Sequence, residues 1–200
     1  MTVSNQPKIG GLLLAAGGSS RLGRPKQLIL LKGRSLLRRA AESLAASRCN
    51  PVAVVLGAEF DACLEQLDGL DISICENGSW SEGISSSIKA GLRHLLDVAP
   101  DIDAVLISLC DQPNVVSTDY NDLIENFIET RSSIVASEYN GTTGVPALFS
   151  NELFDALLAL EGDKGARDLI RRSSNVSTVP VPNASSDIDT PDDLLINSSK

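Results

Sequence analysis

Short apolar runs alternate along the chain with longer segments in which apolar residues recur at helical spacing. The run at 8–16 is apolar, ends in glycines and predicts a buried strand. In the segment 35–47, apolar side chains recur three and four positions apart, which predicts an amphipathic helix. The same criteria predict strands at 51–56, 71–75 (at a sheet edge), 103–109, 133–137, 145–149 and 176–181, and helices at 61–67, 83–96, 118–130, 151–160, 164–172 and 191–196.

This alternation of strands and helices predicts a three-layer α/β/α sandwich around a mostly parallel sheet, because parallel strands need helical crossovers. The connection between the strands at 133–137 and 145–149 is the exception, since it is only as long as a loop. A connection of that length favours an antiparallel neighbour. The chain has 200 residues and no internal repeat or long linker. We therefore expect a single domain over residues 1–200, with one antiparallel strand in its sheet.

The composition fits a folded globular protein and excludes several other classes. Hydrophobic residues make up 42% of the chain and charged residues 22%. The net charge of −9 argues against a protein that coats nucleic acid or an anionic membrane. No apolar run reaches the roughly 18–20 residues of a membrane span, and the start of the chain lacks a signal-peptide pattern. We therefore expect a cytoplasmic protein without nucleic-acid or membrane partners.

Cysteine and histidine usage agrees with that expectation. The cysteines are scattered without a C-x-x-C pair, which indicates reduced and buried thiols rather than a disulfide framework or a zinc site. His94 is the only histidine, so a metal cluster of histidines is excluded, and its place late in a predicted helix favours a surface or helix-end role. The four cysteines are Cys49, Cys63, Cys75 and Cys110.

Charge is distributed unevenly along the chain. Residues 1–48 carry nine basic side chains but only one of the 26 acids, Glu42. A basic segment in an acidic protein indicates a local partner with negative charge. Arg21 and Lys26 have the strongest claim to that partner because they flank a glycine-rich turn. A solvated face is expected for the basic residues on or beside the first predicted helix, which are Lys32, Arg34, Arg38, Arg39 and Arg48.

The glycine-rich turn at 13–26 reads L-L-A-A-G-G-S-S-R-L-G-R-P-K. It leaves the first predicted strand at its carboxyl end, where open α/β sheets bind ligands. Small residues let a ligand approach the backbone, and N–H groups of such a turn bind phosphate oxygens beside the charges of Arg21 and Lys26. The turn matches neither G-x-x-x-x-G-K-[ST] nor G-x-G-x-x-G. The alternative is an ordinary strand–helix loop with surface arginines.

Within this turn, L-A-A-G-x-S-x-R-L-G-x-x-K resembles the signature of the nucleotidyltransferases of molybdenum cofactor biosynthesis. The likeness is greatest to the molybdenum cofactor cytidylyltransferases. It is weaker to the guanylyltransferases of the same pathway and to the cytidylyltransferases of methylerythritol phosphate metabolism. The resemblance extends over nearly the whole chain. Its other segments are N-G-S-W-S-E-G-I-S-S-S-I-K-A-G at 77–91, D-Q-P at 111–113, G-V-P at 144–146, G-D-K-G-A-R at 162–167 and D-I-D-T-P-D-D-L at 187–194.

The resemblance implies a Rossmann-like nucleotidyltransferase fold and a Mg²⁺-dependent transfer of CMP from CTP to the phosphate of molybdopterin, with release of pyrophosphate. The A-A-G at 15–17 resembles the cytidylyl branch, because the guanylyl branch reads A-G-G there. The family often has G-H-P where this chain has G-V-P at 144–146, so the acceptor pocket lacks that histidine. The alternatives are guanylyl transfer, a methylerythritol phosphate or sugar phosphate acceptor, and a non-catalytic carrier that delivers the cofactor to a client molybdoenzyme.

The resemblance also assigns roles to single residues. Arg21 and Lys26 are expected to bind the β- and γ-phosphates and, together with Asp111, to be catalytic. Asp111 and Asp189 are the expected Mg²⁺ ligands, with Asp187 as the alternative to Asp189. The expected nucleotide-binding residues are Leu14, Ala15, Ala16, Gly17, Gly18, Lys26, Asn77, Gly83 and Ser87.

Several of these residues have a structural alternative. Asn77 and Ser87 lie around the start of the predicted helix at 83–96, so capping and turn formation compete with contacts to ribose or base. Trp80, the only tryptophan, either flanks the acceptor pocket or packs, and packing is favoured. The segment 162–167 either closes over the acceptor, with Arg167 on an anion, or simply starts an acidic helix. No general base is evident, which favours an acceptor phosphate that is already ionised at neutral pH.

Overall fold

The computed structural model describes residues 6–18 and 25–185. Its main sheet has seven strands in the order β5-β4-β1-β6-β8-β7-β9. β8 pairs antiparallel with both of its neighbours, and the other pairings in this sheet are parallel, so the expected sheet is confirmed. The strands are β1 (Ile9–Leu14), β4 (Val52–Leu56), β5 (Ser73–Glu76), β6 (Ala104–Leu109), β7 (Ile134–Tyr139), β8 (Thr142–Ser150) and β9 (Val176–Pro180).

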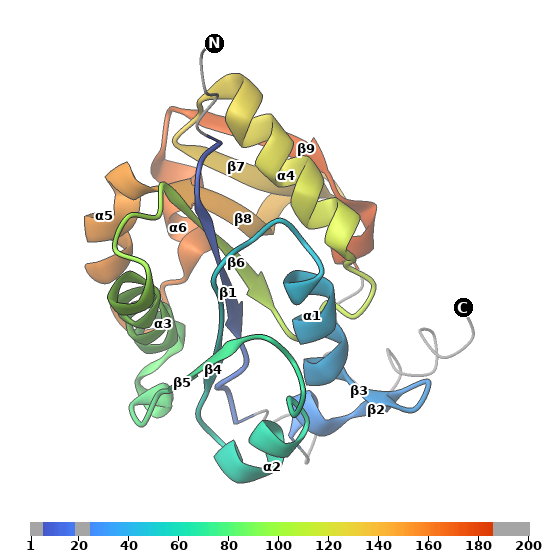
Figure 1. Ribbon diagram of the computed structural model, residues 1–200. Coiled ribbons are helices and arrows are strands. Elements are labelled where there is room, and N and C mark those ends of the chain that lie inside the picture. Colours follow the sequence, from blue (N-terminus) through green and yellow to red (C-terminus); the bar gives the residue numbers. More distant parts are fainter. Residues whose placement is uncertain (1–5, 19–24, 186–200) are drawn as a thin grey trace.

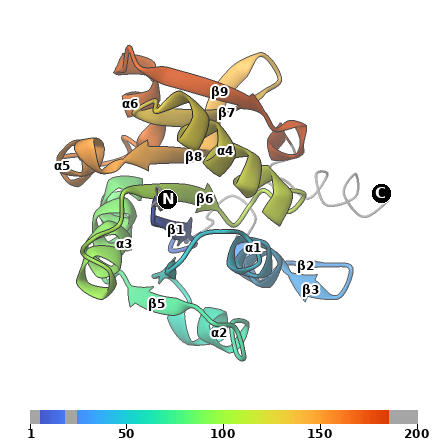
Figure 2. The same cartoon turned by 45° about the horizontal axis from the view of Figure 1, so that its top comes forward.

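Two helical layers cover the sheet, as a three-layer sandwich requires (Figure 1). One layer consists of α1 (Leu36–Ala45), α2 (Phe60–Glu65) and α4 (Ser117–Thr130), and the other of α3 (Ile84–Val98), α5 (Phe154–Leu158) and α6 (Ala166–Arg172). Figure 2 shows α1 and α3 on opposite sides of β1. None of the helices in the described ranges is long and apolar enough to cross a membrane.

The sequence of β1 explains how one strand supports both layers. Successive side chains of a strand point to opposite faces. Leu13 therefore packs in the core under α1, whereas Leu12 and Leu14 pack in the core under α3. α3 approaches this face closely because Gly91 has no side chain: a Cβ there would lie 2.3 Å from Leu12 Cδ1 and 2.6 Å from Val55 Cγ2.

The structure adds short elements that the hydrophobic pattern does not indicate. β2 (Leu30–Leu31) and β3 (Arg34–Ser35) form a small hairpin whose turn residues, Lys32 and Gly33, both have positive φ. Two residues are too few to show a strand period. The helix expected at 151–160 is a 3₁₀ turn (Asn151–Leu153) followed by α5, and the helix expected at 191–196 lies outside the described residues.

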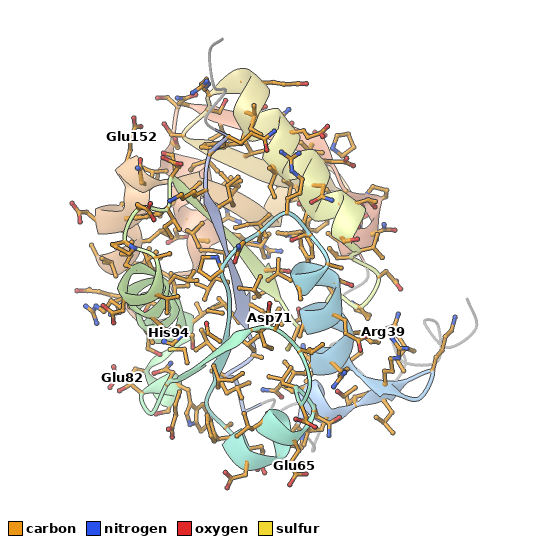
Figure 3. All side chains as sticks on the ribbon, in the orientation of Figure 1. Arg39, Glu65, Asp71, Glu82, His94 and Glu152 are labelled. Carbon is orange, nitrogen blue, oxygen red and sulfur yellow. The ribbon has the colours of Figure 1, made fainter. Side chains whose placement is uncertain are left out.

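The cysteine expectation is confirmed, because all four thiols are free and buried. Burial raises the pKa of Cys49 and of Cys63 to about 11, so both thiols stay protonated at neutral pH. His94 is half-buried near the end of α3, on the layer opposite to Arg39 of α1 (Figure 3).

The basic residues around α1 fit the expected solvated face in part, because Lys32, Arg34 and Arg48 are exposed whereas Arg38 and Arg39 are half-buried. Arg38 Nε bonds to Glu42 Oε1 at 2.9 Å, and its Nη1 donates to the carbonyls of Gln66 and Asp68. Arg48 likewise contacts Glu125 of α4. These arginines connect α1 to neighbouring segments, because a long guanidinium side chain reaches carbonyls that sequence spacing does not reveal.

Candidate active site

Two loops meet at the carboxyl ends of the neighbouring strands β1 and β6. From β1 the chain continues to β4, which lies towards one edge of the sheet, and from β6 it continues to β7, which lies towards the opposite edge. Such a reversal of direction is the place where open α/β sheets form a ligand crevice. The crevice in this protein contains a cavity of about 440 Å³, which we call the first cavity. Its lining residues are Leu14, Ala15, Ala16, Gly17, Gly18, Lys26, Gln27, Trp80, Ser81, Gly83, Ile84, Ser87, Leu109, Cys110, Asp111 and Asp163.

The structure thus brings together, at the first cavity, most of the site residues that the sequence predicts. The side chain of Asn77 is the exception among those it describes, because it lies outside the lining of the first cavity. Arg21, Asp187 and Asp189 fall outside the described residues. Within residues 6–18 and 25–185, no cluster of three or more His, Cys, Asp or Glu side chains is able to hold a metal.

Lys26 and Asp111 form the polar centre of the cavity. Lys26 Nζ lies 3.1 Å from Asp111 Oδ2, and the two side chains are 15% and 22% exposed. A partly buried ion pair of this kind is screened less by water than a surface pair. Asp111 Oδ1 is buried and has no hydrogen-bond partner among the described residues. The carboxylate therefore keeps one oxygen available for a further cation or donor.

Gln27 holds the glycine-rich turn in place, and sequence reasoning missed it. The side chain is 2% exposed, and its Nε2 donates to the carbonyls of Ala15 and Gly17 at 2.8 and 2.6 Å. By binding these carbonyls it fixes the path of the turn that the sequence assigns to phosphates. The available signal was its place directly after Lys26, at the end of the glycine-rich turn.

Asn77 supports the site from behind. Its Nδ2 donates to Ser86 Oγ at 2.9 Å and to Ser87 Oγ at 3.0 Å, and its Oδ1 accepts from the amide of Ser79. The side chain is 4% exposed, so the structure favours the turn-forming alternative for this residue. Ser87 itself lines the cavity, with its hydroxyl oriented by Asn77.

Trp80 both packs and lines the first cavity, so the expectation of packing alone is incomplete. The side chain is 37% exposed. A Cβ added at Gly57 would lie 2.7 Å from Trp80 Cβ, and one at Gly18 would lie 3.0 Å from the outer ring carbons Cζ3 and Cη2. Glycine is therefore needed at position 57, and the indole packs closely against Gly18 beside the turn.

A second cavity of about 390 Å³ adjoins the first. The two share Leu14, Ile84, Leu109, Asp111 and Asp163 in their linings. Much of the second lining is apolar. Its polar part consists of charged side chains, which are Asp111, Asp163, Arg167, Asp168 and Arg171.

The loop with Gly162 and Asp163 is anchored to the start of α3. The amide of Ser85 donates to the Gly162 carbonyl at 3.1 Å. Gly83 has φ of +106°, and a Cβ there would lie 2.5 Å from the carbonyl carbon and oxygen of Gly162. Glycine is therefore required both by the backbone angle and by the close approach. This contact places Asp163 where the two cavities join.

The fold defines a Rossmann-like α/β protein, and its first cavity lies at the carboxyl ends of β1 and β6, where open α/β sheets form a ligand crevice. The chain belongs to the family of the MobA-like NTP transferase domain, whose model matches residues 11–177. The protein is 34% identical over 174 residues to the nicotine blue oxidoreductase of Paenarthrobacter nicotinovorans, covering 83% of each chain. It is 29% identical to the purine catabolism protein PucB of Bacillus subtilis (strain 168), over 94% of each chain.

Solved structures of the same fold are also similar to this chain. The crystal structure of the Rv0371c homologue from Mycobacterium sp. strain JC1 matches with a TM-score of 0.80 and 32% identity, over 96% of each chain. A manganese complex of Rv0371c from Mycobacterium tuberculosis H37Rv matches with a TM-score of 0.74 and 26% identity, over 96% of this chain and 99% of that one. A molybdenum cofactor guanylyltransferase of Sinorhizobium fredii is 31% identical over 55% of this chain and 49% of its own.

Proposed function

We propose that this protein is a Mg²⁺-dependent cytidylyltransferase that transfers CMP from CTP to the phosphate of molybdenum cofactor, with release of pyrophosphate. The observation that carries the proposal is the Lys26–Asp111 pair, which stands in the first cavity while Asp111 also lines the second. A nucleotidyl transfer needs its two substrates on either side of one charged centre. The first cavity takes the nucleoside triphosphate, and the second takes the acceptor.

The first cavity is suited to bind the phosphates of the nucleotide. Gly17 and Gly18 leave the backbone accessible to phosphate oxygens, and Gln27 holds their turn in shape. Lys26 and Arg21 are assigned to the β- and γ-phosphates, where negative charge grows as pyrophosphate leaves. Fixed cations at the position of developing charge are the main source of catalysis in phosphoryl transfer.

The residues at the centre fit a divalent cation. Mg²⁺ binds through one or two carboxylates and completes its shell with phosphate oxygens and water. The buried and unpartnered Oδ1 of Asp111 is a suitable first ligand, and Asp189, with Asp187 as the alternative, is the proposed second. When bound, the ion neutralises charge on the phosphate oxygens. The relative solved with manganese supports a divalent cation in this family.

The chain's own residues then have distinct tasks in the reaction. An oxygen of the acceptor phosphate attacks the α-phosphorus of CTP, and the bond from the α-phosphorus to the bridging oxygen breaks in line. Lys26 stabilises the leaving charge, and Asp111 orients Lys26 through their ion pair. The acceptor phosphate is ionised at neutral pH, so no residue has to remove a proton.

The choice of CTP rests on the A-A-G at 15–17, which matches the cytidylyl branch. Pyrophosphate release should be measured with CTP and GTP, each with molybdopterin as acceptor. Release with CTP should exceed release with GTP, and an equal or reversed preference would contradict the base assignment. Release with a sugar phosphate or methylerythritol phosphate but not with molybdopterin would replace the acceptor.

Asp111→Asn tests the catalytic centre. We expect a loss of about 10²-fold or more in kcat, as for removal of one group that stabilises transition-state charge. Asp97→Asn is the matched control, because Asp97 is exposed on α3 and lines neither cavity. If Asp111→Asn left cofactor delivery unchanged in cells, the carrier alternative, with a client molybdoenzyme as partner, would be favoured over catalysis.

The similarity to a nicotine blue oxidoreductase supports a second candidate, an oxidoreductase acting on an aromatic compound in the second cavity. This candidate requires a redox cofactor in the first cavity instead of CTP. Incubation with NADH or NADPH and a heterocyclic dye distinguishes the two, since cofactor oxidation without pyrophosphate release would favour it.

A further inference from the structure

Tyr139 holds Arg167 at the second cavity. Its side chain is 7% exposed, and its hydroxyl accepts from Arg167 Nη2 at 3.1 Å while donating to the Val145 carbonyl at 3.1 Å. Gly144 leaves room for this contact, because a Cβ there would lie 2.7 Å from the Tyr139 hydroxyl and 3.0 Å from Arg167 Nε. The guanidinium is thus held against β8, and less side-chain entropy is lost when it binds a ligand.

Arg167 keeps donors free for such a ligand. Its hydrogen bond to Tyr139 uses one of the five N–H donors of an arginine, and it makes no other bond to the described residues. Arg171 follows one helical turn later on α6, lines the same cavity and has no hydrogen-bond or ion-pair partner in residues 6–18 and 25–185. Two neighbouring guanidinium groups make a binding site for an anion.

Much of the remaining lining is apolar. It comes from α3, β6 and β8 and includes Ile84, Ile88, Ile107, Leu109 and Val145. A surface of this kind stabilises a ligand by taking its apolar area out of water. The volume of about 390 Å³ is within the usual range of small-molecule pockets.

We propose that the second cavity selects acceptors with an apolar body and one anionic group, and that Arg167, positioned by the Tyr139 hydroxyl, binds that anion. This inference rests on the proposed function, since it takes the second cavity as the acceptor side. Arg167 is the binding residue and Tyr139 the positioning residue. Val145, which stands where the family often has histidine, supplies apolar surface and the carbonyl that orients Tyr139.

The acidic side chains of the second cavity restrict where an anion can bind. Asp111 is paired with Lys26, and Asp163 lies at the junction with the first cavity. Asp168 lies in the first turn of α6, near Arg167 and Arg171. An anion is disfavoured beside Asp111 and Asp163 and favoured beside α6, because the two guanidinium charges there outweigh the single charge of Asp168. Removing Arg167 should consequently abolish the preference for an anionic ligand.

Binding can be tested without any transfer reaction. Pterin-6-carboxylate and uncharged 6-methylpterin are fluorescent probes of similar shape, and their anisotropy reports binding. The wild type should bind the carboxylate at least about 10-fold more tightly, and Arg167→Ala should remove that difference, as expected for one charge-assisted hydrogen-bonded contact. Arg172→Ala is the matched control on the same helix, because Arg172 is exposed and does not line the cavity.

The outcomes are decisive in both directions. A preference for the carboxylate that survives in Arg167→Ala would overturn the inference. So would tighter binding of 6-methylpterin by the wild type, or no binding of either probe at millimolar concentration. If the preference depends on Arg167 but no cytidylyl transfer occurs with any acceptor, the proposed function fails and the anion site stands.

Tyr139→Phe tests the positioning role. Val145 keeps a donor in this variant, because Gln112 Nε2 also bonds to its carbonyl at 3.0 Å, so the fold should persist. We expect the acceptor KM to rise about 3- to 10-fold, with kcat and the KM for CTP within about 2-fold of wild type. Arg167→Lys should restore part of the carboxylate preference lost in Arg167→Ala. Equal changes in both KM values would show that Tyr139 is merely structural.

Discussion

The two cavities differ in the chemical groups that line them. The described part of the first cavity uses the backbone of a glycine-rich turn, Lys26, Asp111 and Asp163, with hydrogen bonds from Gln27 and Asn77 holding the surrounding segments in place. The second uses aliphatic side chains and the guanidinium groups of α6. Backbone amides and small residues recognise what all nucleotides share, whereas a lining made of side chains changes with each substitution. The comparison suggests why relatives with one fold carry names that refer to different chemistry.

The largest effect should come from the centre that the cavities share. Lys26→Met keeps the aliphatic stem but removes the charge beside Asp111, so kcat/KM should fall about 10²- to 10³-fold for every acceptor. Steady-state pyrophosphate release measures this change. Lys32→Met, on the exposed turn of the β2–β3 hairpin, is the control. A loss confined to one acceptor would show that Lys26 belongs to the acceptor side.

Gly83→Ala should disturb both cavities together. The new methyl group would meet Gly162 at 2.5 Å, and φ of +106° is unfavourable for alanine. We expect destabilisation of about 1–3 kcal/mol and higher KM values for both substrates. Thermal unfolding and initial rates measure these effects. Gly78→Ala is the control because a Cβ there meets nothing within 4 Å, and a similar loss in that variant would contradict the explanation.

Gln27→Ala should weaken ligand binding in the first cavity without affecting the second. It removes the donor to the Ala15 and Gly17 carbonyls, which loosens the turn of the first cavity alone. The KM for CTP should rise about 10-fold, the effect of one to two lost hydrogen bonds, while the anisotropy of bound pterin-6-carboxylate stays unchanged. Weaker probe binding in this variant would show that the two cavities are coupled.

The single tryptophan offers a smaller and more selective signal. Trp80 lines the first cavity but not the second, so its fluorescence should change when CTP binds. Pterin-6-carboxylate should leave the fluorescence nearly constant once its own absorption is corrected. Protection of Trp80 from iodide quenching by CTP provides a second measurement, and no protection would place the nucleotide elsewhere.

The smallest effect is expected away from both cavities. The hydrogen bond from Arg38 lowers the pKa of Glu42, and the positive charge of Arg34 lowers it further. A carboxyl with a lowered pKa stabilises the fold above its unfolded pKa and loses that contribution as the pH falls through its folded pKa. Glu42→Gln should therefore cost no more than about 0.5 kcal/mol at pH 7, and nothing at a pH well below 4. Chemical denaturation at both pH values measures the difference.

Patterns within short segments predicted most of the fold. β1 and α1 follow from apolar spacing, and the antiparallel β8 follows from the short connection after β7. The β2–β3 hairpin could not be predicted, because strands of two residues show no period. For Trp80 the sequence favoured packing over a place beside the acceptor pocket and did not indicate the first cavity, because its place beside Gly18 depends on segments more than 60 residues apart meeting in space.

The sequence by itself determined the layers of the sheet, the location of the glycine-rich turn and the residue types available for a triphosphate and a cation. Periodicity and chain order carry that information, because helices and parallel strands form from local spacing. Only the tertiary structure decided that Lys26 pairs with Asp111, that Asn77 supports rather than lines the cavity, and that Tyr139 holds Arg167. These contacts join residues far apart in the chain, and their geometry depends on how the layers pack.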